Sequence, residues 1–291
     1  GIRIRGITMD DHIIWKENEA TQLFRERING IFSMIGEKAL TYYEAKGSRC
    51  SDLYAFIYKY AMEKQLPNTI VALPVVRAII SQAAKSECKN GLDETRYLKN
   101  FEHALFVSRM LIDLNVNFRD DEEDIAIAAA LCHILPEHIK SRDLEDKLKG
   151  YFHLDPRVYK IVRLLYEDGN LPDSELREYY ENIQKNKLAL LVTLTDRANV
   201  VEELYDMSTW EVHRYIHETR NYYFPMCIYA KEHYYSLISP VSILKDKIRT
   251  LTEVSEILLN RFEAREAELL QDIIRLKEDN ATIKGIIKEL C

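Results

Sequence analysis

The chain has few of the residues that make tight turns. Only nine of its 291 residues are glycine and seven are proline. Glycine adopts positive φ angles and proline fixes φ, so many short strands joined by turns need more of both. Hydrophobic residues make up 47% and charged residues 30%, which suits a globular protein rather than a disordered one. We therefore predict an all-α protein built from long helices.

Paired cysteines are also missing from the sequence. The five cysteines are odd in number and scattered, without any C-x-x-C spacing. They are Cys50, Cys88, Cys132, Cys227 and Cys291. This pattern is neither a disulfide framework nor a zinc finger, so a reducing compartment is expected. We predict a cytoplasmic location.

Long apolar runs and excess positive charge are absent too. No run approaches the ~18 uninterrupted apolar residues of a membrane span, and the segment Gly1–Arg5 lacks a signal-peptide core. The net charge of −7 argues against general nucleic-acid binding, but leaves room for a local basic pocket for a phosphorylated ligand. Glycine-rich phosphate loops and the G-x-S-x-G nucleophile motif are also missing.

Apolar spacing and turn residues divide the chain into three regions. Residues 1–91 form a helical N-terminal region, in which Ser51 is a candidate N-cap and Pro67-Asn68 marks a break. The first helical pattern runs through Trp15, Leu23, Ile28, Phe32 and Ile35. In the second region, 92–238, an acidic turn at Asp120–Asp124 precedes a helix over 125–135 that Pro136 should end. Asp155-Pro156 starts another helix.

The third region, 239–291, is predicted as one long helix or coiled coil. Apolar residues follow a 4-3 spacing, with Ser255, Arg265, Asp272 and Asp279 in the same stripe. The apolar members are Leu244, Ile248, Leu251, Leu258, Phe262, Leu269, Leu276, Ile283, Ile286 and Leu290. We predict that residues 244–290 mediate self-association or bind a partner helix. The alternative is an amphipathic helix that folds back on its own domain.

Three separated segments carry the residues with the most chemistry. Asn100-Phe101-Glu102-His103 opens an apolar helix, the alanine-rich segment 128–137 contains His133, and the segment 194–199 contains Asp196-Arg197. Together and in this order, they resemble the HD superfamily of metal-dependent phosphohydrolases. The closest resemblance is to the RelA/SpoT-type domain that hydrolyses the alarmone (p)ppGpp. It covers about residues 92–238.

This resemblance implies an HD-type helical domain with a metal site. His103, His133 and Asp196 would bind a divalent metal, with manganese implied by the resemblance, and Glu137 would orient the water. Imidazole and carboxylate are suitable ligands for such an ion. A divalent ion lowers the pKa of water and neutralises phosphate oxygens, which a phosphohydrolase needs. The implied ligand is a nucleotide.

The sequence departs from the family pattern at several of these positions. The second signature should read His-Asp, but Ile134 stands where a metal-bridging carboxylate is expected. His138 replaces an aspartate, and Val200 stands where the family has an asparagine, with Asn199 one place early. Arg96 is the nearest candidate for the family's arginine loop. We expect Ile134 to line the site and to weaken metal binding and hydrolysis.

The single residues also have ordinary explanations. A histidine on an apolar helix is commonly a core or capping residue, and Asp196-Arg197 could be an N-cap with an ion pair. His213 and His217 lie four residues apart, a spacing that can bind metal, but we favour an exposed helix face. Three functions therefore stay open: a metal-dependent nucleotide phosphohydrolase, an inactive nucleotide-sensing regulator, or a coiled-coil interaction protein.

Overall fold

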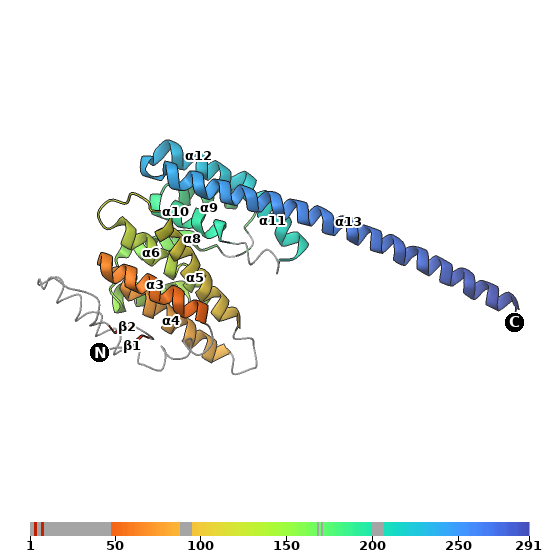
Figure 1. Ribbon diagram of the computed structural model, residues 1–291, viewed down its shortest axis with the longest axis horizontal. Helices are drawn as coiled ribbons and strands as arrows, with labels where there is room; N and C mark the ends of the chain where they lie inside the picture. The colour runs from red at the N-terminus through yellow and green to blue at the C-terminus, as the bar shows by residue number, and fades with distance from the viewer. Residues whose placement is uncertain are drawn as a thin grey trace, which may run out of the picture.

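The computed structural model describes residues 3–4, 7–8, 48–87, 95–167, 169, 171–199 and 207–290. Across them the prediction of an all-α protein is confirmed (Figure 1). The α-helices are α3 (Ser48–Lys64), α4 (Pro67–Glu87), α5 (Thr95–Asp113), α6 (Glu122–Cys132), α7 (Ser141–Glu145), α8 (Pro156–Leu165), α9 (Asp173–Gln184), α10 (Lys187–Ala198), α11 (Thr209–Glu218), α12 (Phe224–His233) and α13 (Ile238–Leu290). The shorter elements are the 3-10 turns η2 (Leu135–Glu137) and η7 (Tyr235–Leu237), the π-helical segments η3 (Asp146–Tyr151) and η6 (Thr219–Tyr223), and the antiparallel strand pair β1 (Arg3–Ile4) and β2 (Ile7–Thr8).

Helix α6 lies at the centre of the helical domain. Every residue from Asp124 to Cys132 is buried, and α4, α5, α8 and α10 all pack against it. A helix that is apolar on all sides is stable only when neighbours cover it completely. The alanines at 126 and 128–130 are small enough to let those neighbours approach closely. The core that forms around α6 is continuous from Cys50 to Ile248.

A buried carboxylate joins the start of α6 to the start of α4. Asp124 accepts hydrogen bonds from the backbone N–H groups of Asn68 (2.9 Å) and Thr69 (2.8 Å) and from the Asn68 side chain (2.9 Å). Burial nevertheless raises the pKa of Asp124, against the effect of these hydrogen bonds. The sequence predicted an acidic first turn that stabilises its own helix. In the structure, Asp124 of that turn instead accepts hydrogen bonds from the free N–H groups at the start of α4.

Most predicted helix boundaries lie close to the observed ones. Helix α6 ends at Cys132, ahead of Pro136, and α8 starts at Pro156 with Asp155 accepting a hydrogen bond from the Arg157 N–H. The prediction that Ser51 caps a helix was wrong, because α3 starts at Ser48. Helix α5 begins at Thr95, so the segment Asn100–His103 lies inside it rather than at its opening.

Helix α13 has two parts with different surroundings. Its first half packs against α10, α11 and α12, and Leu244 and Ile248 are fully covered there. Leu259 is its last buried residue, and the rest of the helix extends away from the other helices toward the C-terminal end (Figure 1). The long helix was predicted. The stripe from Leu244 to Leu290 was expected to serve one interface, but the helical domain itself covers the first part.

Several sequence predictions concern residues outside the described part of the chain. These include the helical pattern from Trp15 to Ile35, the position of Val200, and the side chain of Arg96. The division of the chain at 91/92 and 238/239 also stays a prediction. None of the described helices combines the length and the apolar character that a membrane crossing requires.

We predict that Asp124→Ala lowers the free energy of unfolding by about 1–3 kcal/mol, because it leaves buried N–H groups of Asn68 and Thr69 without an acceptor. Denaturant unfolding followed by circular dichroism measures this change. Glu181→Ala on the exposed face of α9 is the matched control and should unfold like the parent chain. Equal stability of the Asp124 variant would show that this capping contact contributes nothing.

Candidate metal centre

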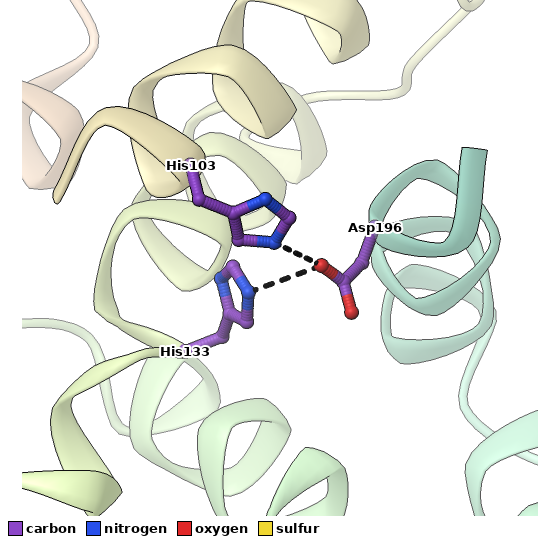
Figure 2. A group of neighbouring side chains, drawn as sticks. All are labelled: His103, His133 and Asp196. Atoms are coloured by element: carbon purple, nitrogen blue, oxygen red, sulfur yellow. Dashed lines mark hydrogen bonds and ion pairs between the residues drawn. The ribbon is translucent and has the colours of Figure 1, made fainter. Parts of the chain in front are cut away.

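Three helices far apart in the sequence bring two histidines and a carboxylate together. His103 lies in the middle of α5, His133 directly follows α6, and Asp196 lies in the last turn of α10. These helices pack against one another in pairs. One ligand atom of each residue lies within 4.8 Å of the others (Figure 2). The structure therefore brings these three side chains together.

Both imidazole rings are directed at one oxygen of the carboxylate. The Nε2 atom of His103 lies 2.5 Å from Asp196 Oδ1, and the Nε2 atom of His133 lies 3.4 Å from the same oxygen (Figure 2). The side chains of His103 and His133 are 16% and 11% exposed, whereas that of Asp196 is 34% exposed. The group is thus reachable from solvent on the carboxylate side.

The proton position on His133 follows from its backbone contact. Its Nδ1 atom lies 2.5 Å from the carbonyl oxygen of Ala130, an atom that can only accept a hydrogen bond. Nδ1 must therefore carry the proton, which leaves the Nε2 lone pair directed at Asp196 when the ring is neutral. A lone pair facing a carboxylate oxygen is favourable only with a positive charge between them or a second proton on the ring.

The charge state of Asp196 fits a ligand role. Desolvation alone would raise the pKa of this carboxyl group. The attraction and hydrogen bond of His103 and the contacts of His133 outweigh desolvation and hold the pKa well below its usual range. In this arrangement the two histidines therefore favour the carboxylate form of Asp196.

Glu137, the predicted water-orienting residue, lies outside this ligand group. Its carboxylate accepts a hydrogen bond of 3.0 Å from Asn100, which precedes His103 by one helical turn of α5. His138 contacts the same amide at 3.2 Å, and its ring packs against Tyr97. The exposed Glu137 is therefore held beside the helix that carries His103.

A pocket of about 410 Å³ adjoins this loop. Its lining includes Glu137, His138, Lys140, Tyr159 and Arg163. Lys140 and Arg163 are exposed and have no ion-pair partner among the residues that the structure describes. Two cationic side chains, the Glu137 carboxylate and a tyrosine ring therefore share the lining of this pocket.

Ile134 is 5% exposed and belongs to the continuous hydrophobic core. The residue that follows His133 therefore contributes apolar packing, where the resembled family has a metal-bridging carboxylate. That it lines the ligand site and weakens metal binding stays a prediction.

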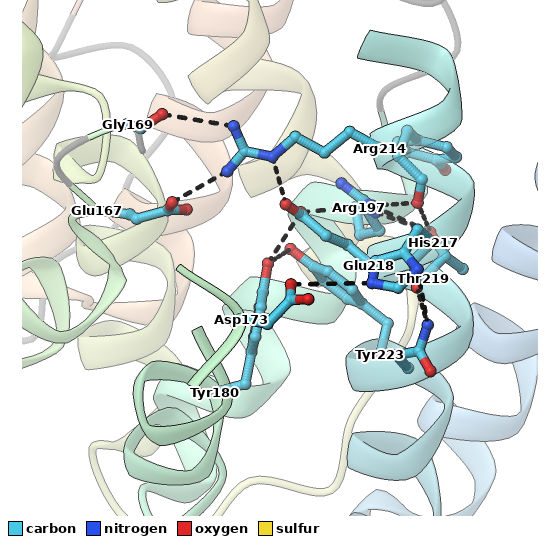
Figure 3. A network of polar contacts seen from close by, with 12 residues as sticks. Glu167, Gly169, Asp173, Tyr180, Arg197, Arg214, His217, Glu218, Thr219 and Tyr223 are labelled. Carbon is cyan, nitrogen blue, oxygen red and sulfur yellow. Dashed lines mark hydrogen bonds and ion pairs between the residues drawn. The ribbon is translucent and has the colours of Figure 1, made fainter. Parts of the chain in front are cut away.

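Arg197 forms a network of contacts that the sequence analysis did not predict. Its guanidinium carbon lies 3.8 Å from the ring centre of Tyr215 and 4.3 Å from that of Tyr223. It donates hydrogen bonds to Thr219 Oγ1 (3.0 and 3.2 Å) and to the Tyr215 carbonyl oxygen (2.7 Å). Figure 3 shows how these contacts join Arg197 to α11 and the π-helical segment η6. The arginine thus fixes the end of α10 directly after Asp196.

A buried carboxylate completes this network. Glu218 accepts hydrogen bonds from Arg214 (2.6 Å) and from the Tyr180 hydroxyl (3.2 Å), and lies 4.0 Å from Arg197 (Figure 3). The alternative in which Asp196 is an N-cap is wrong, because Asp196 lies near the C-terminal end of α10. The four-residue spacing of Tyr215, Thr219 and Tyr223, which puts them near one helix face, was the sequence signal for this network.

His213 and His217 lie on an exposed helix face, as predicted. Their side chains are 54% and 55% exposed. The His213 Nε2 atom lies 2.7 Å from a carboxylate oxygen of Glu263 on α13, and His217 lies 3.9 Å from Asp173. These contacts join α11 to α13 and to α9.

No protein-family model matches the chain, and no curated protein is significantly similar to it.

We predict that Arg197→Lys lowers the free energy of unfolding by about 2 kcal/mol, because an ammonium group cannot reproduce the forked hydrogen bonds between two tyrosine rings. The same substitution should weaken Mn²⁺ binding by displacing Asp196. Denaturation and calorimetry measure the two effects. Arg249→Lys, at an exposed position of α13, is the control and should change neither quantity. An unchanged Mn²⁺ affinity in Arg197→Lys would contradict the positioning role.

Proposed function

We propose that this chain binds one divalent metal ion through His103, His133 and Asp196 and hydrolyses a phosphorylated nucleotide such as (p)ppGpp. The observation that carries the proposal is the convergence of these three ligand atoms within 4.8 Å from three separate helices. The sequence resemblance to HD-type phosphohydrolases supports the choice of reaction and substrate.

The residues present fit a divalent ion by their chemistry. Two imidazoles and one carboxylate are the ligand set of many open, catalytically useful metal sites. The hydrogen bond from His133 Nδ1 to the Ala130 carbonyl fixes the ring tautomer, as an outer-shell partner commonly does for a metal ligand. When bound, the ion would supply Lewis-acid chemistry, lowering the pKa of water and offsetting phosphate charge.

The protein's own groups would divide the remaining tasks. Lys140 and Arg163, in the pocket beside Glu137, would attract the phosphates, and the Tyr159 ring in the same pocket would contact the base. Glu137 would accept a proton from water once it leaves its hydrogen bond with Asn100. Arg197 would keep Asp196 in position through its contacts with α11 and η6.

A second candidate function is nucleotide sensing without hydrolysis. The observation that favours it is the buried Ile134, which supplies no charge beside His133. His138, packed on Tyr97, also differs from the family's carboxylate. A chain of this kind would keep the pocket and the metal ligands and pass the binding signal to a partner.

A reducing cytoplasm remains the compartment that we propose. Of the cysteines that the structure describes, Cys50, Cys132 and Cys227 are buried and none forms a disulfide. Burial raises the pKa of the Cys132 thiol to about 12 and that of Cys227 to about 11. Both thiols are therefore protonated and unreactive at neutral pH.

We predict that His103→Ala, His133→Ala and Asp196→Ala each lower Mn²⁺ affinity at least tenfold, because each removes a ligand atom. His213→Ala is the matched control, since this exposed histidine pairs with Glu263 and lies outside the ligand group, and it should bind Mn²⁺ like the parent chain. Titration calorimetry gives the affinity and the stoichiometry. Elemental analysis of the purified protein should find less than one metal per chain. Two tightly held ions would contradict this prediction.

The reaction itself is tested with (p)ppGpp and Mn²⁺, by following pyrophosphate release. The proposal expects slow release that disappears in Asp196→Ala. Binding of (p)ppGpp without release would favour the sensing function instead. Failure to bind the nucleotide at all, in a protein that binds Mn²⁺, would overturn the choice of substrate while leaving the metal site intact.

We also predict that Ile134→Asp raises Mn²⁺ affinity about tenfold or more over Ile134→Asn, because only the aspartate adds a negatively charged ligand oxygen. Both variants place a polar group in the core and should be less stable than the parent without metal. Thermal unfolding with and without Mn²⁺ separates these effects. Equal affinities of the two variants would show that residue 134 does not face the site.

A further inference from the structure

Past the ion pair of Glu263 with His213, the last part of α13 extends beyond the domain and has no cover in the described structure. The buried residues of this helix are Pro240, Val241, Leu244, Ile248, Thr252, Ser255 and Leu259. From residue 260 to 290 no residue is buried. Leu276 is 62% exposed and Leu290 is 81% exposed. We call residues 262–290 the stalk.

The stalk carries an apolar seam that continues from Leu259. Its members follow alternating steps of four and three residues, which place them along one stripe of the helix. They are Phe262, Glu266, Leu269, Ile273, Leu276, Asn280, Ile283, Ile287 and Leu290. The stripe predicted from the sequence had Arg265, Asp272, Asp279 and Ile286 at four of these places. The seam that continues from Leu259 has the next residue in each case, namely Glu266, Ile273, Asn280 and Ile287. Only Glu266 and Asn280 are polar.

The order of residue types along the seam indicates how many helices pair. Leu269, Leu276 and Leu290 lie at heptad position d, where Ile283 is the one isoleucine, and the β-branched Ile273 and Ile287 lie at position a. Isoleucine at a with leucine at d favours two parallel strands. Asn280 also lies at position a, where a single asparagine selects the two-stranded register at a cost in stability.

The charges beside the seam indicate that the partner is a second copy in parallel orientation. Position g of one helix faces position e of the next heptad on the other. Asp272 would therefore face Lys277 of the second copy, and Asp279 would face Lys284 of the second copy. An antiparallel pair would set aspartates against aspartates and lysines against lysines, which is unfavourable. The chain is thus complementary to itself in one orientation only.

The position of the stalk leaves room for a partner helix. Its four heptads extend for about 40 Å at 1.5 Å per residue. Seven residues of a straight α-helix turn about 20° less than two full turns. Residues spaced by sevens therefore shift around the helix axis, by roughly 80° over the four heptads from Ile248 to Leu276. A second helix can therefore pack on the stalk from a direction that the helical domain does not occupy.

We propose that residues 262–290 pair with the same residues of a second copy as a parallel two-stranded coiled coil. The two helical domains then lie at one end of the stalk. This inference uses none of the metal-site residues, so its test is independent of the proposed function.

Two neighbouring isoleucines test the seam in the full chain. Ile273 and Ile274 are almost equally exposed, at 49% and 50%, but only Ile273 lies in the seam. Light scattering should give the parent chain twice its mass of 34.2 kDa. Ile273→Glu should give a monomer, whereas Ile274→Glu should remain a dimer. Near-UV circular dichroism should show that the helical domain stays folded in both variants.

Charge reversal tests the orientation. In the double variant Asp272→Lys with Asp279→Lys, like charges would face each other in a parallel pair, and the dimer dissociation constant should rise roughly tenfold. Adding Lys277→Asp and Lys284→Asp should restore the parent value. A parent chain that is monomeric or trimeric, a dimeric Ile273→Glu, or a double variant that dimerises as tightly as the parent would overturn the proposal.

Discussion

The burial of α6 from Asp124 to Cys132 is the constraint on which the rest of the structure depends. A helix that is apolar on every side cannot stay in contact with water, so α4, α5, α8 and α10 must surround it. Its alanines allow close approach, and Asp124 fastens its first turn to α4. The direction in which α6 ends is thereby fixed, and with it the position of His133.

The candidate metal centre follows from this packing. Because α5 and α10 are both neighbours of α6, His103 and Asp196 reach the end of α6 from two sides. The hydrogen bond with the Ala130 carbonyl then orients the His133 ring. The contacts of Arg197 hold the end of α10 that carries Asp196. The site is therefore held by rigid elements, a condition for orienting metal ligands accurately.

The sequence predicted the features that depend on composition and on neighbouring residues. Scarce glycine and proline predicted the all-α class, and Asp155-Pro156 predicted the start of α8. That His103, His133 and Asp196 belong together was implied only by the family resemblance. The sequence analysis could not find that Asp124 caps α4, because that contact joins residues 56 positions apart. It also could not tell which surface covers an apolar stripe, so Leu244 and Ile248 were assigned to a partner although their own domain buries them.

The central claim is that His103 and His133 together with Asp196 hold a divalent ion. Electron spin-echo spectroscopy of the Mn²⁺-loaded protein tests this most directly, because imidazole nitrogen bound to manganese modulates the echo. The account predicts modulation from two histidine nitrogens, reduced in His103→Ala and in His133→Ala and unchanged in His213→Ala. A spectrum without nitrogen modulation, or one that neither ligand variant changes, would contradict it.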